Sequence, residues 1–172
     1  MPLRPGRVIS RPKRPWTRVS KSKPRKSYVV GVPYPKISQF EMGTRTGNFD
    51  CEIFLVSKDN VQIRDNALEA SRIVAQKFLE KKLGLANYFL KILIYPHNVI
   101  REHSIATGAG ADRFSQGMRL AFGRPVGKSS IVRKGQRLVM LRMNKSNIEI
   151  AKAALVRAGK KIRARTRIEV KE

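Results

Sequence analysis

The first forty residues of the chain contain eleven Lys or Arg and no Asp or Glu, and the first acidic residue is Glu41. A run of like charges repels itself and cannot collapse around a core of its own, so another molecule must neutralise it. Seven of the nine prolines fall at or before Pro35, where they remove backbone donors and disfavour helix. We therefore expect residues 1–36 to form an extended basic arm and residues 37–172 to form a single folded domain.

Nucleic acid is the polyanion that best fits this excess of charge. The whole chain has 37 Lys and Arg against 12 Asp and Glu, a net charge of +25, which indicates an electrostatic footprint for RNA or DNA. Residues 41–100 are nearly balanced, whereas residues 101–172 are again strongly basic. The arm residues expected to contact RNA are Arg4, Arg7, Arg11, Lys13, Arg14, Trp16, Arg18, Lys21, Lys23, Arg25 and Lys26.

Composition also limits the class of protein. Hydrophobic residues make up 41% of the chain, enough for one core. The single cysteine, Cys51, excludes an internal disulfide framework and fits a reducing compartment. The start of the chain has no apolar stretch typical of a secretory signal, and no apolar run approaches the roughly 20 residues of a membrane helix. We expect a cytoplasmic protein that does not enter a membrane.

Three aromatic residues, Trp16, Tyr28 and Tyr34, interleave with the charges of the arm. Cations for phosphates and aromatic rings for unstacked bases are typical of proteins that bind single-stranded RNA. A second interpretation stays open, in which Tyr28 and the valines at positions 29, 30 and 32 form the first strand of the core.

The pattern of residues 49–95 predicts a strand, a helix and a second strand. Residues 49–55 alternate between apolar and polar, as expected of a strand with one buried face. A helix is expected from Asp65 or Asn66, with Asn66 and Glu69 in capping-box spacing and Gly84 as its stop. The apolar run Tyr88–Tyr95, closed by Pro96, predicts a central strand.

Residues 138–170 repeat this order. Residues 138–143 predict a strand, and residues 146–149 are in capping-box spacing before a helix that ends at Gly159. Residues 162–170 alternate and predict a last strand. Two strand–helix–strand units imply an α+β domain with two helices packed on a mixed sheet. Arg163, Arg165 and Arg167 would then share one face of the last strand, spaced like successive phosphates, or form an ordinary solvated face.

A long segment, from His97 to about Val126, fits neither period. It is rich in glycine and arginine, and we expect a flexible loop over about residues 101–125, here called the Gly/Arg loop. Glycine allows close approach of the backbone to a ligand, and arginine contacts phosphates in bidentate fashion. The open alternative is an idle insertion. Basic or flexible residues expected to face RNA in and after this loop are Arg101, His103, Gly108, Gly110, Arg113, Arg119, Arg124, Lys128 and Arg133.

Motifs for catalysis fail on inspection. Residues 123–129 resemble a phosphate-binding loop but have three residues between the glycines instead of four, with Pro125 among them. His97, His103 and Cys51 are not at metal-ligand spacing. Ser104 or Ser115 with His103 and Asp112 would be too close in one loop to form a triad. We expect no enzyme activity, no metal and no cofactor.

Several motifs of the chain, read in order, resemble one family of ribosomal proteins. They are Gly31-Val-Pro33, residues 67–70 (ALEA), residues 99–101 (VIR), residues 109–113 (AGADR), residues 117–119 (GMR) and residues 121–125 (AFGRP). Together they are similar to the archaeal and eukaryotic large-subunit ribosomal protein L ten e, the counterpart of bacterial L sixteen. The chain lacks the C-terminal extension associated with eukaryotic members and so looks archaeal.

The resemblance implies an α+β fold of the hammerhead type and a role as a structural constituent of the large ribosomal subunit. Family members bind large-subunit rRNA near the 5S rRNA, beside other ribosomal proteins, and their loop reaches toward the peptidyl-transferase centre and tRNA to help position aminoacyl-tRNA. By position, Arg101, Arg113 and Arg119 would lie nearest tRNA. We also expect residues 103–116 to be mobile without tRNA. The residues alone leave open an enzyme that acts on RNA with this loop as its active site, using His103 and Asp112, and a protein that coats DNA.

Overall fold

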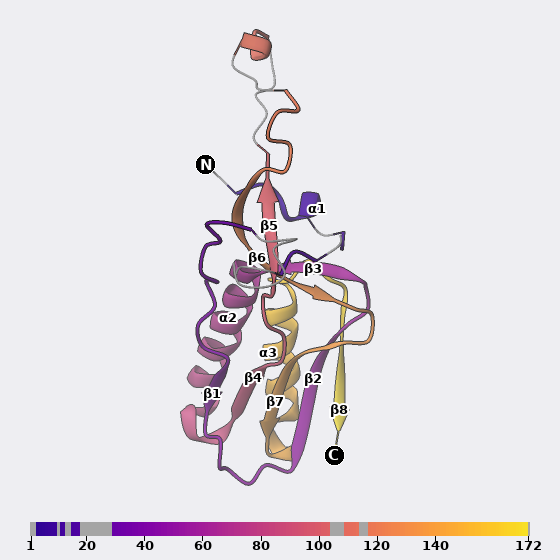
Figure 1. Cartoon of the computed structure of the whole chain (residues 1–172). Coiled ribbons are helices and arrows are strands. Elements are labelled where there is room, and N and C mark those ends of the chain that lie inside the picture. The colour runs from indigo at the N-terminus through magenta and orange to yellow at the C-terminus, as the bar shows by residue number, and fades with distance from the viewer. Residues whose placement is uncertain are drawn as a thin grey trace.

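A computed structural model describes residues 3–9, 11–12, 15–17, 29–103, 109–113 and 117–171 of the chain. Figure 1 shows a layered α+β body from one end of which the Gly/Arg loop projects. The α+β class is therefore confirmed. Within the described residues, no helix has the length and apolar character needed to cross a membrane.

The larger sheet has five strands in the order β1-β4-β7-β2-β8, and each pair is antiparallel. The expected mixed sheet is thus antiparallel in all pairings of its described strands. The strands are β1 (Glu41–Gly43), β2 (Cys51–Ser57), β4 (Phe89–Ile92), β7 (Arg137–Met143) and β8 (Thr166–Lys171).

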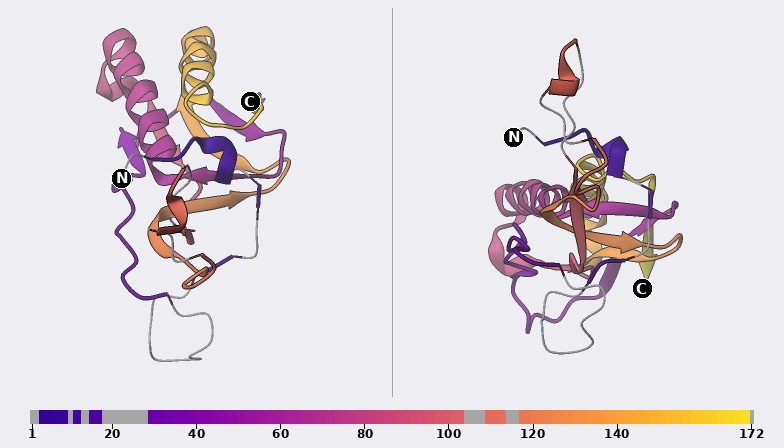
Figure 2. Two further views of the ribbon diagram at one scale, coloured as in Figure 1. Left: turned by 90° about the horizontal axis from the view of Figure 1, so that it is seen from above. Right: turned by 45° about the horizontal axis from the view of Figure 1, so that its top comes forward.

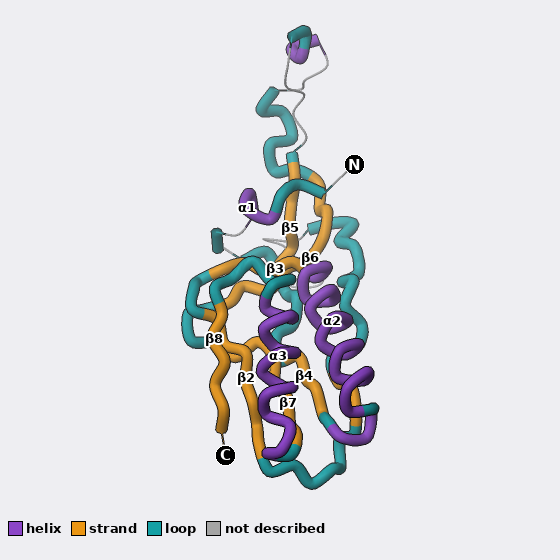
Figure 3. The backbone as a smooth tube through the Cα atoms, turned by 180° about the vertical axis from the view of Figure 1, so that it is seen from behind, coloured by secondary structure: helices purple, strands orange, loops and turns teal. Residues whose placement is uncertain are grey.

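Two helices, α2 (Asp65–Leu83) and α3 (Ile148–Gly159), cover one face of this sheet (Figure 3). Leu79 of α2 and Leu155 of α3 are fully buried in the same core cluster as Leu141 of β7. Removing one such leucine side chain costs about 2–5 kcal/mol. This apolar layer is what holds the helices on the sheet.

Strand β2 is buried on both faces, not on one as its alternation predicted. Ile53 belongs to the helix-covered core, whereas Phe54 and Phe89 form a second cluster on the opposite face. The guanidinium carbon of Arg137 lies 4.0 Å from the centre of the Phe54 ring, so an amphipathic side chain helps to cover this face.

Both expected capping boxes are wrong, because neither helix has a side-chain cap at its N-terminus. Asp65 instead accepts the Asn66 amide at 2.9 Å, and Glu69 pairs with Arg72. The carboxylate of Glu149 pairs with Lys152. The expected stop at Gly84 is confirmed: this residue has φ +76°, which glycine adopts at little cost.

A second, three-stranded antiparallel sheet was missed by the sequence patterns. Its order is β3 (Val61–Arg64), β6 (Arg124–Val132) and β5 (Asn98–Glu102). Strands β5 and β6 occupy both ends of the segment that fitted neither period. The described strands therefore extend into both ends of the expected Gly/Arg loop, because β5 ends at Glu102 and β6 begins at Arg124.

The remaining described elements are short: α1 (Gly6–Ile9) and three 3₁₀ turns at Leu85–Asn87, Ala111–Arg113 and Lys145–Asn147. The α1 turn departs from a fully extended arm. Figure 2 shows that the described arm segments cross the end of the body from which the loop projects. Val29 is buried, but residues 29–32 are not a strand, and Tyr28 lies outside the described residues.

The last strand begins later than predicted, at Thr166 instead of position 162. Backbone bonds from Lys161 to Ala158 and from Ile162 to Gly159 continue the end of α3 into a turn. Arg163 and Arg165 therefore precede β8, and only Arg167 lies in the strand. The expected row of three arginines on one strand face is wrong.

Candidate nucleic-acid interface

Most described carboxylates are already paired, which leaves the excess positive charge of the chain uncompensated. Ion pairs join Glu41 to Lys91, Glu52 to Arg142 and Asp59 to Arg165, among others. The hydrogen bond from Lys91 lowers the pKa of Glu41. With 37 basic and 12 acidic residues in the chain, pairing consumes the acids and leaves cations to face solvent.

Arg101 fixes the base of the projecting loop by packing against two aromatic rings that also touch each other. Its guanidinium carbon lies 4.5 Å from the centre of Trp16 and 3.8 Å from that of Phe122. One of its nitrogens also donates to the Phe122 carbonyl at 2.7 Å. Burial lowers the pKa of Arg101, but a guanidinium stays protonated in proteins. Its charge is held inside this stack, which we call the neck stack.

The backbone of the arm is pinned to strand β5 at the same place. The Trp16 amide donates to the Asn98 side chain at 2.8 Å, and the Val99 amide donates to the Trp16 carbonyl at 2.8 Å. The rings of Trp16 and Phe122 meet edge to face, with centres 5.1 Å apart. The side chain of Trp16, a residue expected to contact RNA, thus packs within the protein.

The two strands leaving the body are also held together directly. Gly123 has φ +76°, and a Cβ there would lie 2.6 Å from the carbonyl carbon of Glu102. His103 Nε2 lies 2.8 Å from the Gly117 carbonyl oxygen, and Arg4 forms an ion pair with Glu102. We call this closure of β5 and β6, together with the neck stack, the neck of the loop.

Beyond the neck, the described loop residues expose basic and apolar side chains together. Arg113 and Arg119 are exposed, as are Met118 and Leu120. Figure 1 places the turn at 109–113 at the far end of the projection. Gly110 and Gly117 have positive φ. Gly108, Ser104, Ser115 and the side chain of Asp112 lie outside what the structure describes.

Only some of the arm residues expected to bind RNA lie in the described part of the chain. Arg4 is placed against β5, Arg7 lies in α1, and Arg11 is exposed. The remaining arm cations predicted to bind RNA lie outside the described residues: Lys13, Arg14, Arg18, Lys21, Lys23, Arg25 and Lys26.

A further basic group gathers around the turn between β2 and β3, far from the loop in sequence. Asp59 Oδ1 accepts from Arg165 at 2.9 Å, and the Lys134 amide donates to Asn60 at 2.7 Å. The Arg165 hydrogen bond lowers the pKa of Asp59. Lys134 belongs to the neighbouring turn between β6 and β7, and Arg133 is exposed in that turn.

Of the other predicted contacts, Arg163 and Arg124 are exposed and Lys128 is half-buried in β6. Arg167 is exposed and pairs with Glu169 at 2.6 Å. Sequence reasoning missed Phe122 and Asn98 as partners of the arm. The aromatic residue in the AFGRP motif was the available signal for Phe122, but its partner Trp16 is distant in sequence.

No group of three or more metal-ligating side chains occurs in the described part of the chain. The described residues define an α+β protein with a strongly basic surface and a loop that projects from a fixed neck.

The comparisons with known proteins identify its family. A model described as ribosomal protein L16p/L10e matches residues 16–169, so the chain belongs to that family of structural ribosomal proteins, which are not enzymes. It is 44% identical to the large ribosomal subunit protein uL16 of Archaeoglobus fulgidus, covering 96% of this chain and 95% of the relative. The protein of that name from Picrophilus torridus is 46% identical, covering 90% and 89%. The ribosome is thus where the chain acts.

Proposed function

We propose that this chain is a structural constituent of the large ribosomal subunit that binds its rRNA. Family membership supports the assignment, as do relatives named large ribosomal subunit protein uL16 that match almost end to end. The physical support is the surplus of cations left after the described acids are paired. Such a surface binds RNA with an affinity that falls steeply as salt is raised.

We further propose that the body and arm anchor the protein near the 5S rRNA while the loop reaches toward the peptidyl-transferase centre. There it would help to position aminoacyl-tRNA. The observation that carries this proposal is the neck, because a braced base lets a loop with exposed Arg113 and Arg119 project in a defined direction. A loop that served only as anchor would need no such brace.

Sedimentation tests the first part of the proposal. The protein should sediment with large subunits in low salt and be released in high salt, because counterion release weakens phosphate contacts. Quantitative recovery in the fraction without RNA at low salt would contradict it.

Charge reversal in the loop tests the second part. The Arg113→Glu, Arg119→Glu double variant should enter subunits normally and lower the affinity of ribosomes for aminoacyl-tRNA. The matched control is Lys77→Glu with Lys81→Glu, which makes the same change in charge at exposed positions of α2. Equal tRNA affinity in both double variants would argue against a tRNA role for the loop.

A further inference from the structure

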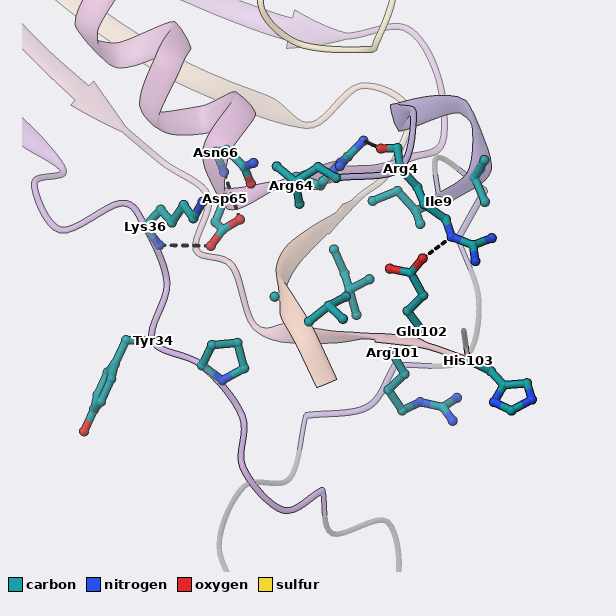
Figure 4. Close-up of a pocket in the computed structure, with 16 residues that line it drawn as sticks. Arg4, Ile9, Tyr34, Lys36, Arg64, Asp65, Asn66, Arg101, Glu102 and His103 are labelled. Atoms are coloured by element: carbon teal, nitrogen blue, oxygen red, sulfur yellow. Dashed lines mark hydrogen bonds and ion pairs between the residues drawn. The ribbon is translucent and has the colours of Figure 1, made fainter. Parts of the chain in front are cut away.

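Four separate parts of the chain enclose a cavity of about 250 Å³ beside the neck (Figure 4). They are the start of the arm, residues 33–36, the first residues of α2, and the facing parts of β5 and β6. Because its walls come from segments distant in sequence, no sequence motif could have indicated this cavity.

One wall of the cavity is apolar and uncovered by the described chain. Leu3 is 58% exposed, Val8 55% and Val126 44%, and Ile100 lies beneath them. Exposed aliphatic side chains that gather in one hollow offer a surface for an apolar, flat group. Tyr34 is at the rim, with its ring turned away from the hollow in Figure 4.

Both acidic residues in the cavity wall have partners within the protein. Asp65 accepts the backbone amides of Lys36 and Asn66, each at 2.9 Å. Glu102 pairs with Arg4, as the dashed lines in Figure 4 show. Only Glu102 is paired with a cation, so the phosphate of a bound group is expected on the side away from Asp65, where the described lining is basic.

A second, more open hollow adjoins the first and is lined by cations. Arg4 and Arg64 line both hollows, and the Arg64 guanidinium donates to the Arg4 carbonyl at 2.6 Å. Lys161 and Arg163 complete its basic lining, which contains no Asp or Glu. A cavity with one apolar wall thus lies directly beside a basic surface suited to phosphate.

We propose that these adjoining hollows bind one unstacked nucleotide of RNA. The base lies against Leu3, Val8 and Val126, and its phosphate lies toward Arg64 and Arg163. This inference rests on the proposed RNA-binding function and adds a specific site to it. An apolar side chain from a neighbouring protein would fill the first hollow but gain nothing from the cations beside it.

The purified full chain can be tested with two RNA hairpins. One carries a single bulged 2-aminopurine, and in the other the same base is paired with uridine. The native protein should bind the bulged hairpin about tenfold more tightly, near the low end of what holding one base contributes. The bulged 2-aminopurine should also change in fluorescence on binding.

Two variants locate the effect in the cavity. Val126→Phe fills the hollow. Leu3→Gln removes part of the apolar wall at an exposed arm position, where the change should not unfold the protein. Both variants should lose the preference for the bulged hairpin. The matched control is Val170→Phe, because Val170 is similarly exposed (41%) but lies in β8, outside both hollows.

The outcomes separate this site from the general function. Equal affinity of the native protein for the two hairpins would overturn the nucleotide site while leaving RNA binding intact, and is the result expected if a protein segment occupies the hollow. A preference that survives in both cavity variants would overturn it too. Failure to bind either hairpin would count against the RNA-binding function itself.

Discussion

At the scale of single residues, Arg101 acts inside the protein. The resemblance placed it nearest tRNA, but its guanidinium packs against the rings of Trp16 and Phe122 and donates a hydrogen bond to the Phe122 carbonyl. A cation–π contact contributes about 0.5–1 kcal/mol at an exposed site and more as the pair is desolvated. We therefore assign Arg101 to the direction of the loop, and exposed Arg113 and Arg119 to its contacts.

Fluorescence of Trp16 reports on the neck stack, since it is the only tryptophan in the chain. Phe122→Ala should shift its emission to the red and increase quenching by acrylamide, because an aromatic neighbour is removed. Leu120→Ala, in the same loop but 67% exposed, is the control and should leave the emission unchanged. Identical spectra for both variants would show that the stack does not form in solution.

Substitution of Gly123 should open the neck. Gly123→Ala places a Cβ 2.6–2.8 Å from backbone atoms of Glu102 and His103 at a positive φ. Such a conformation costs about 1–3 kcal/mol in a residue other than glycine, so we expect faster amide exchange around the neck.

The control for this prediction is Gly127→Ala in β6. A Cβ at Gly127 meets nothing within 4 Å, and its φ is not positive. Unchanged amide exchange in both glycine variants would mean that the close approach at Gly123 is not needed to hold the neck.

The Asp59–Arg165 pair predicts a specific pH dependence. The Arg165 hydrogen bond lowers the pKa of Asp59 below the 3.8 of a free aspartate. The stabilisation of the folded state by this ion pair is therefore complete above pH 3.8. It is lost only as the pH falls through the lower pKa that Asp59 has in the folded protein. A carboxyl-carbon NMR titration should give a midpoint below 3.8, returning toward 3.8 in Arg165→Gln. A native midpoint at or above 3.8 would contradict the pairing.

At the scale of elements, the turn before β8 is expected to contribute more to RNA binding than the strand itself. Arg163 lines the basic hollow beside the cavity, whereas Arg167 is paired with Glu169. Arg163→Glu should weaken binding to rRNA and reduce the salt slope by about one unit, the value of one phosphate contact. Arg167→Glu should have the smaller effect.

Thermal unfolding of the same two variants provides the check on this comparison. Both positions are exposed, so each change should alter the free energy of unfolding by about 0.5 kcal/mol or less. A greater loss of binding in Arg167→Glu, with both variants folded, would show that the strand face carries the contact.

Elements with strong local signals could be predicted from the sequence. The apolar run at 88–95 contains β4, residues 138–143 lie within β7, and Gly84 ends α2. Each rests on periodicity or on a glycine in the chain itself. Capping boxes failed because Asp65 takes up the Asn66 amide and Glu69 is drawn to Arg72.

The three-stranded sheet could not be predicted, because its strands are joined only by pairing over long distances. Strand β3 has only four residues. It pairs with β6, where Val61 lies opposite Val132, a residue far away in the sequence. The neck likewise joins Trp16 to residues more than 80 positions away. The sequence showed that the site would be rich in Arg and Lys. It did not show which of these residues form ion pairs or ring contacts within the protein.

At the scale of the whole molecule, the chain divides into an anchor and a projection. The sheet-and-helix body is held by an apolar core, and the described arm segments lie across the end from which the loop leaves. The arm that cannot fold alone thus has two roles in our account, because it adds positive charge and its Trp16 braces the neck.

Directed hydroxyl-radical cleavage from the loop tests this division most directly. The only native cysteine, Cys51, is buried, and Met118 is 78% exposed, so Met118→Cys provides one accessible thiol for an iron chelate. In assembled large subunits we predict cleavage of peptidyl-transferase RNA and of the acceptor end of bound tRNA. The same probe on Val170→Cys, on the body, should cleave a different set of rRNA sites. Cleavage of one common set from both positions, with tRNA untouched, would contradict the account.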